Sequence, residues 1–240
     1  MSVLILACEV MREELLRVPA LAPVEFSFLS MGLHVAPERL RAALAAELAK
    51  PREVDRIVLG FGLCGNAVDG LVSPHAPMVI PRTHDCIAVL SGGVGLPETG
   101  ASLERGTFYL SGGWMEGERT LMSEHRRTVQ RFGERKALRV LSTLLDAYQR
   151  FLFIRTDHPR CEAREREAAE VAALVGLPVH SVAGDRSYLA ELVNGPWSAE
   201  RFISVPRGEL LSANAFAPRD PPGRSEPSAA AAPSLTEPRP

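Results

Sequence analysis

The chain has 240 residues, of which 46% are hydrophobic and 23% are charged, and its four cysteines are too few for a disulfide scaffold. This composition excludes a chain disordered along its whole length, a collagen-like repeat and a disulfide miniprotein. A formal net charge of −2 and an aromatic content of 6% argue against binding to nucleic acid or acidic lipid. No apolar run approaches the roughly 20 residues that a membrane helix needs.

The first residues predict a buried strand rather than a secretory signal. Leu4–Cys8 faintly resembles a lipoprotein cleavage box, but no basic segment precedes it, and the charged residues Glu9 and Arg12 follow at once. We therefore expect a cytoplasmic protein. In that compartment cysteines are reduced, which favours metal binding or thiol chemistry over disulfides.

Apolar runs and helical periodicities alternate along the chain. The expected strands are 3–7, 24–29, 54–62, 78–80, 107–110, 151–155, 178–182 and 202–205. The expected helices are 9–17, 37–50, one that opens at Asp85 as its cap, a stretch at 118–149 interrupted near Gly133, 162–175 with a stop at Gly176, and 188–193. This alternation predicts an α/β fold with a single doubly wound, mostly parallel sheet and helices on both faces.

The composition changes near the end of the chain. Residues 218–240 hold seven of the 19 prolines, together with an alanine run at 229–232, and show no hydrophobic periodicity. We therefore expect one α/β domain over residues 1–216 and a disordered tail, rich in proline and alanine, over residues 217–240.

Three cysteines follow predicted strands. Cys8 ends the first strand, Cys64 follows the third and Cys86 follows the fourth. Ligands of doubly wound sheets bind outside the carboxyl ends of the strands. If the first, third and fourth strands are neighbours, the three thiols meet at one such edge.

Three thiols with a neighbouring histidine form a donor set for a metal ion. Cys8, Cys64 and Cys86 are the expected ligands, with His84 as a candidate fourth, and zinc is the expected metal. An iron–sulfur cluster is the alternative, and Cys161 is the remaining cysteine that such a cluster would need. The competing interpretation is that the cysteines pack as small apolar side chains.

Five further residues near this edge are candidates for holding a cofactor. Gly62, Gly65 and Asn66 lie in a glycine-rich turn whose backbone amides can approach a ligand, although tight turn geometry alone also explains the glycines. Arg82 suits an anion or a surface ion pair. Trp114 suits stacking on a flat ligand or packing in the core.

Several separated segments occur in the order of a known family: Ile5–Glu9, Leu59–Asn66, Ile80–Ile87, and Gly106–Leu110 with Gly113-Trp114. Together they resemble the family catalogued as domain of unknown function 1638, over roughly residues 3 to 205. Phe61, Phe108 and Ser111 are mild departures from the family's residues, and Cys161 matches none of its motifs.

The resemblance implies a setting rather than a mechanism. Members of this family are associated with corrinoid-dependent methyltransferases, which implies corrinoid-linked one-carbon metabolism and a corrinoid protein or methyltransferase as partner. The corrinoid is expected only through that partner. Three readings remain open: a metal-binding protein that is a methyltransferase or a component of one, a non-enzymatic accessory or cofactor-delivery protein, and a small-molecule binder with inert cysteines.

Overall fold

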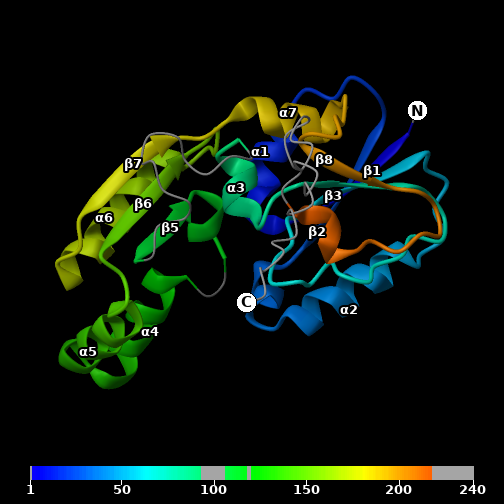
Figure 1. The fold of residues 1–240 in the computed structure, drawn as a ribbon. Helices are drawn as coiled ribbons and strands as arrows, with labels where there is room; N and C mark the ends of the chain where they lie inside the picture. The colour runs from blue at the N-terminus through cyan, green and yellow to red at the C-terminus, as the bar shows by residue number, and fades with distance from the viewer. Residues whose placement is uncertain (1, 93–105, 118–119, 218–240) are drawn as a thin grey trace, which may run out of the picture.

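The computed structural model describes residues 2–92, 106–117 and 120–217, so the expected tail lies almost wholly outside the described residues. The fold is α/β, as predicted, but the strands form two sheets (Figure 1). The first sheet has the order β2-β1-β3-β4-β8 and the second has the order β5-β6-β7. The strands are β1 (Val3–Cys8), β2 (Val24–Leu29), β3 (Arg56–Gly60), β4 (Met78–Pro81), β5 (Thr107–Ser111), β6 (Arg150–Arg155), β7 (Val179–Ala183) and β8 (Phe202–Val205).

The α-helices connect these strands in the predicted alternation. They are α1 (Arg12–Arg17), α2 (Pro37–Leu48), α3 (Cys86–Leu90), α4 (Leu121–Phe132), α5 (Glu134–Leu145), α6 (Cys161–Val175) and α7 (Arg186–Asn194). Short 3-10 helices cover Glu9–Met11, Met31–Val35, Gly113–Met115 and Ala213–Phe216. No helix among the described residues has both the length and the apolar character needed to cross a membrane.

The prediction of one sheet is wrong because β8 occupies the position that a continuous sheet would give to β5. β8 pairs with the outer edge of β4 in antiparallel orientation, with Met78 opposite Val205. β5 instead pairs in parallel with β6, and β6 with β7. The remaining pairs of the first sheet are parallel, so β2, β1, β3 and β4 end at a common edge.

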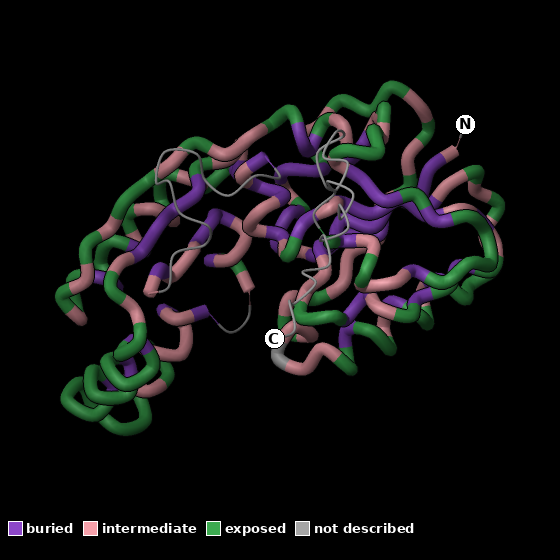
Figure 2. The backbone as a smooth tube through the Cα atoms, viewed as in Figure 1, coloured by how far each residue is buried: buried purple, intermediate pink, exposed green. Residues whose placement is uncertain are grey.

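Each sheet has its own hydrophobic cluster. The first cluster is centred on β1, whose six residues are all buried, and includes side chains from α2, α7 and β8. The second lies between β5, β6 and the helices α5 and α6. Figure 2 shows the buried strands as continuous purple tubes in the middle of each sheet, with exposed residues concentrated on the outer helices.

The carboxyl ends of the two sheets meet at the centre of the molecule. The 3-10 helix after β1 contacts the 3-10 helix after β5. At this contact a Cβ added to Gly113 would lie 1.8 Å from the carbonyl oxygen of Val10, so only glycine permits the approach. Figure 1 shows α1 and α3 between the two sheets. The segments that follow β1 and β5 therefore meet in a seam between the two sheets.

Candidate functional site

The three cysteines lie where the sequence places them. Cys8 is the last residue of β1, Cys64 follows β3 in a loop, and Cys86 is the first residue of α3, just after β4. The condition for their meeting is fulfilled, because β1, β3 and β4 are consecutive neighbours in the first sheet. Three segments that are distant in sequence thus bring thiols to one edge, which we call the thiol edge.

A tight backbone contact joins the loops that carry Cys64 and Cys86. The amide of Leu63 donates to the carbonyl of Thr83 at 2.9 Å, and the amide of Cys64 donates to the carbonyl of His84 at 2.8 Å. The Asp85 side chain then caps α3 by accepting from the amide of Ala88 at 3.0 Å, as predicted for this residue. These bonds fix the start of α3, and with it Cys86, beside the Cys64 loop.

The Cys64 loop contains a run of left-handed backbone conformations. Cys64 has a φ of 47°, Gly65 of 64° and Asn66 of 66°. Glycine and asparagine tolerate this region, but cysteine has no special tolerance for it, and the conformation costs on the order of 1–3 kcal/mol. Such strain concentrates at functional sites, which singles out Cys64 among the three thiols.

All three thiols are at least partly buried. Cys8 and Cys86 are buried and Cys64 is half-buried. Burial raises the pKa of Cys8 and of Cys64 to about 12, and it raises the pKa of Cys86 well above the ordinary value of 9.0. Negative charge on Cys64 adds to the shift at Cys8, and charge on Cys8 and Cys64 adds to the shift at Cys86. Charge on Cys64 therefore acts on both of the other thiols, and all three thiols are protonated at neutral pH.

The thiols are not arranged as a preformed metal centre. Within residues 2–92, 106–117 and 120–217, no group of three or more His, Cys, Asp or Glu side chains is placed so that it could hold a metal ion. A metal ion bound here would have to draw the sulfurs together and displace their protons.

His84 and Arg82 contribute to the thiol edge differently from the sequence expectation. His84 is exposed, and its carbonyl rather than its ring contacts the Cys64 loop. The guanidinium of Arg82 donates to the carbonyls of Ala215 and of Ala199, the latter at 3.3 Å. Arg82 thus holds the segments around β8 against the end of β4.

The other predicted cofactor residues are spread around the same edge. Gly62 is buried against Asp85, whereas Gly65 and Asn66 are exposed, and the Asn66 carbonyl accepts from Arg41 at 2.7 Å. Trp114 is half-buried and packs against the first hydrophobic cluster. Its indole nitrogen has no hydrogen-bond partner among the described residues. Trp114 therefore has the packing role that was the alternative to stacking on a ligand.

His34 is a further residue of this edge, and it is not among the candidates named from the sequence. Its ring stacks on Phe61 with a centroid separation of 6.3 Å, and its Nδ1 lies 3.2 Å from the carbonyl oxygen of Met31. Burial lowers the pKa of His34, while the charges of Asp85 and Glu9 oppose that shift. His34 follows β2, whose carboxyl end lies at the same edge of the first sheet as those of β1, β3 and β4. The rule that ligands bind at this edge would have identified His34 as a candidate site residue.

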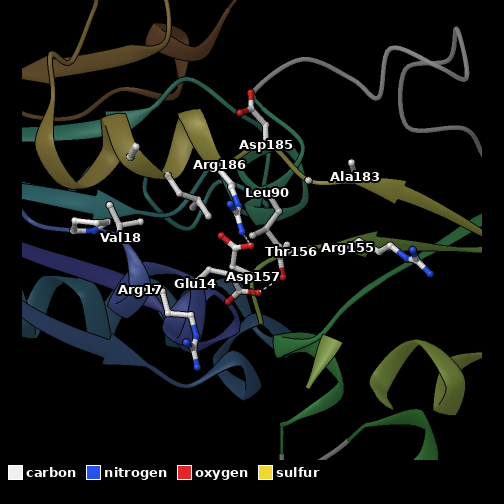
Figure 3. Close-up of a pocket in the computed structure, with 14 residues that line it drawn as sticks. Glu14, Arg17, Val18, Leu90, Arg155, Thr156, Asp157, Ala183, Asp185 and Arg186 are labelled. Carbon is white, nitrogen blue, oxygen red and sulfur yellow. Dashed lines mark hydrogen bonds and ion pairs between the residues drawn. The ribbon is translucent and has the colours of Figure 1, made fainter. Parts of the chain in front are cut away.

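A pocket of about 440 Å³ lies in the seam between the two sheets (Figure 3). Its polar groups come from α1, from the residues that follow β6 and from the start of α7. Figure 3 shows the side chains of Glu14, Asp157 and Arg186 directed toward the middle of the pocket, while Arg155 points away from it. Arg186 forms an ion pair with Asp157.

Glu14 is the buried charged group of this pocket. It is only 2% exposed, and its Oε1 accepts a hydrogen bond from the Thr156 hydroxyl at 2.6 Å. Its second oxygen, Oε2, has no partner among the described residues. Burial raises the pKa of Glu14, and the nearby charges of Glu13 and Glu116 raise it further.

The sequence contains a pattern that would have identified Glu14. Val10, Glu14 and Val18 are four residues apart, so the carboxylate occupies a position on the apolar stripe of the first helical segment. A charged residue at such a position is buried with its stripe, and buried charges require partners.

Comparison with known proteins identifies the family but no characterised relative. No curated protein and no solved structure matches the chain. A family model does match, over residues 28–193, a span that includes Cys64 and Cys86 but not Cys8 or β8. Because this span is more than half of the chain, the resemblance seen in the sequence is confirmed: the protein belongs to the family described as protein of unknown function (DUF1638).

Proposed function

We propose that this chain is a cytoplasmic metal-binding protein that uses the thiolates of Cys8, Cys64 and Cys86 as ligands. The observation that carries the proposal is the position of three thiols at the carboxyl ends of three strands that are consecutive neighbours in one sheet. The effect of charge on Cys64 on the pKa values of Cys8 and Cys86 supports it. Zinc is the preferred metal, because thiolates are its usual structural ligands, and an iron–sulfur cluster is the alternative. The exposed His84 ring would have to turn inward to serve as a fourth ligand.

The high thiol pKa values are compatible with this role. A protonated thiol resists oxidation and alkylation, so the metal-free site is protected. A cation that binds thiolates releases their protons, and its affinity then rises with pH. If the Cys64 turn moves when the metal binds, a change of its φ angle away from 47° releases the backbone strain. This release of strain favours the movement.

We further propose corrinoid-linked one-carbon metabolism as the setting. The family resemblance supports this setting, and a thiolate-bound metal is chemistry that methyl transfer employs. On this proposal the chain is a methyltransferase or a component of one, and its partner is a corrinoid protein or a methyltransferase.

The second candidate function is a non-enzymatic accessory protein that binds a corrinoid protein or delivers a small ligand. Two observations favour it. The thiols are protonated and therefore poor nucleophiles as they stand, and the seam between the sheets already contains a formed pocket.

Metal analysis of the full chain purified without oxygen tests the metal site. We expect about one metal ion per chain, and its loss in Cys8→Ser, Cys64→Ser and Cys86→Ser, because a hydroxyl does not ionise near neutral pH. Cys161→Ser is the matched control, since Cys161 packs against the second hydrophobic cluster. A metal-free parent protein, or three variants that retain the metal, would contradict the proposal.

A second experiment separates the two candidate functions. The purified chain is mixed with a corrinoid protein and a methylated amine or ether, and both demethylation and complex formation are measured. Turnover that is lost in Cys64→Ser supports a methyltransferase role. A stable complex without turnover supports the accessory role.

A further inference from the structure

The helices α4 and α5 form a hairpin, residues 121–145, that projects from the second sheet (Figure 1). The two helices pack closely on each other, and both contact α6. Figure 2 shows most of the hairpin in the colour of exposed residues. Most of the hairpin surface is therefore open to a partner.

The hairpin carries an excess of positive charge. Six basic and two acidic residues give it a net charge of +4, whereas the whole chain has a net charge of −2. Arg126 pairs with Glu167, and Arg127 pairs with Glu124. The other four basic residues form no ion pair among the described residues: Arg131, Arg135, Lys136 and Arg139. Their charge is available to an acidic partner.

The hairpin also exposes apolar side chains. Ala137, Leu141 and Leu145 are spaced by four residues and form the buried row of α5. Val140 and Leu144 each precede a member of this row by one position, and they are 41% and 57% exposed. The apolar face of α5 is therefore wider than the area that its packing against α4 and α6 covers.

Phe132 extends this exposed apolar surface toward the tip of the hairpin. Lys136, Val140 and Leu144 are spaced by four residues, so they lie in one line along α5. The Lys136 ammonium lies 4.2 Å from the centroid of the Phe132 ring, and Phe132 is 50% exposed. We call Phe132, Val140 and Leu144 the hairpin stripe. The stripe has a cation at its tip end.

A groove between α4 and α5 lies beside the hairpin stripe. Its lining includes Leu121 of α4 and both Val140 and Leu144 of α5. Glu124 also lines the groove, and its charge is compensated by Arg127 at 2.9 Å. A groove between two helices accepts the apolar ridge of a third helix, as in helix-in-groove recognition. A flat bilayer does not fill such a groove, and a nucleic-acid backbone presents phosphates rather than an apolar ridge.

The charge of the hairpin determines what kind of helix fits. A second copy of the hairpin would bring two surfaces of net charge +4 together, and such like-charge contacts are costly. An acidic helix has the complementary charge, which both attracts it and fixes its orientation on the surface.

We propose that the hairpin is the docking surface for an acidic amphipathic helix of a partner protein. The apolar residues of that helix, three and four positions apart, pack on Phe132, Val140 and Leu144. Its carboxylates pair with Lys136 and with Arg131, whose guanidinium lies 5.2 Å from the centroid of the Phe132 ring. This inference goes beyond the proposed function and does not depend on it, because the hairpin contains none of the three thiols.

Fluorescence anisotropy of labelled peptides with the full chain tests the partner chemistry. The probe is a helical peptide of about 20 residues, with leucines on one face and glutamates on the other. One control peptide has the same composition with the leucines distributed around the helix, and a second has lysine in place of glutamate. We expect the probe to bind at least about tenfold more tightly than either control. Its affinity should fall as the salt concentration rises from about 50 to about 300 mM.

Equal binding of the three peptides, or no binding of the probe at about 1 mM, would overturn the proposal. Vesicles of phosphatidylserine and a DNA duplex are tested in parallel. Binding of either without binding of the probe peptide would assign the hairpin to a membrane or to nucleic acid, and would equally overturn the proposal.

Two substitutions on α5 test the assigned contacts. Leu144→Glu places a like charge where an apolar residue of the probe would pack, and Lys136→Glu reverses the charge beside Phe132. We expect each to weaken binding of the probe at least about tenfold. Leu21→Glu and Arg39→Glu are the matched controls, because both residues are exposed and lie outside the hairpin, and these variants should bind the probe as the parent does.

Lys136 is exposed on α5, so Lys136→Glu keeps the test decisive even if Leu144→Glu disturbs folding. Affinity that is unchanged in Lys136→Glu, or lowered equally in Arg39→Glu, would rule out the hairpin as the docking surface.

Discussion

Gly62 lies so close to Asp85 that a Cβ added at position 62 would stand 2.4 Å from the Asp85 amide nitrogen. The contact brings the loop after β3 against the start of α3, and it places Cys64 beside the segment that carries Cys86. A glycine is required here by the close approach of two backbones rather than by its own φ angle.

Gly62→Ala should therefore lower the free energy of unfolding by about 1–3 kcal/mol, the usual range for overpacking against atoms that cannot move away. Urea denaturation measures the change. Gly32→Ala is the control, because the nearest atom to its added Cβ is the Ser30 hydroxyl at 3.6 Å. Equal stability of the two variants would show that the loops separate easily.

The thiols of the metal-free protein should react slowly. With a pKa of about 12, only roughly one Cys64 side chain in ten thousand is a thiolate at pH 8. We expect the rate of iodoacetamide labelling at Cys64 to rise about tenfold for each pH unit between 7 and 10, as followed by mass spectrometry. A rate that is already pH-independent at pH 8 would mean that the pKa is lower than the burial implies.

The backbone of Cys64 predicts a difference between two variants that both lack the thiol. Cys64→Gly should be more stable than Cys64→Ser by roughly 1 kcal/mol, because glycine adopts a φ of 47° without strain. Thermal or urea denaturation of the metal-free proteins measures this difference. Variants of equal stability would indicate that the turn relaxes once the thiol is gone.

Glu14 makes the stability of the protein depend on pH. Its pKa in the folded protein is raised above the ordinary value of 4.5, mainly by burial, so folding favours the protonated form. That contribution is fully present below about pH 4.5 and is lost as the pH rises through the folded-state pKa. Glu14→Gln cannot ionise and should not show this loss.

Melting temperatures between pH 4 and 8 check this expectation. The Tm of Glu14→Gln should rise relative to the Tm of the parent protein as the pH increases, because only the parent must bury a carboxylate at high pH. The hydrogen bond from Thr156 can be retained by the amide oxygen, so a difference in Tm that is constant over the whole range would argue against ionisation as its cause.

The order of the elements and a few of their boundaries could be predicted from the sequence because their determinants are local, whereas β3 is shorter than the expected 54–62 and α7 longer than the expected 188–193. β2 and β8 have the predicted ends, Gly133 separates α4 from α5, and α6 ends at Gly176 in a left-handed conformation with a φ of 70°. The division into two sheets could not be predicted in this way. Periodicity reports whether a strand is buried, whereas the choice of β8 over β5 as the neighbour of β4 is made between segments far apart in the sequence.

For the candidate site, the sequence predicts which strand ends carry the cysteines but not how the side chains point. The convergence of Cys8, Cys64 and Cys86 follows from the rule that parallel strands end at a common edge. Side-chain direction does not follow from that rule. Arg82 extends toward carbonyls more than 100 residues along the chain, at separations of 117 and 133 residues, and no local pattern encodes such a contact.

The pairing of β8 with β4 also determines the order in which the sheets can be completed on the ribosome. The second sheet has all its strands once Ala183 has emerged, whereas the first lacks its edge strand until Val205. Because domains form from the amino terminus during synthesis, the nascent chain exposes the unpaired edge of β4 throughout the translation of β5, β6 and β7. An exposed strand edge promotes aggregation, and β4 presents such an edge until β8 is made.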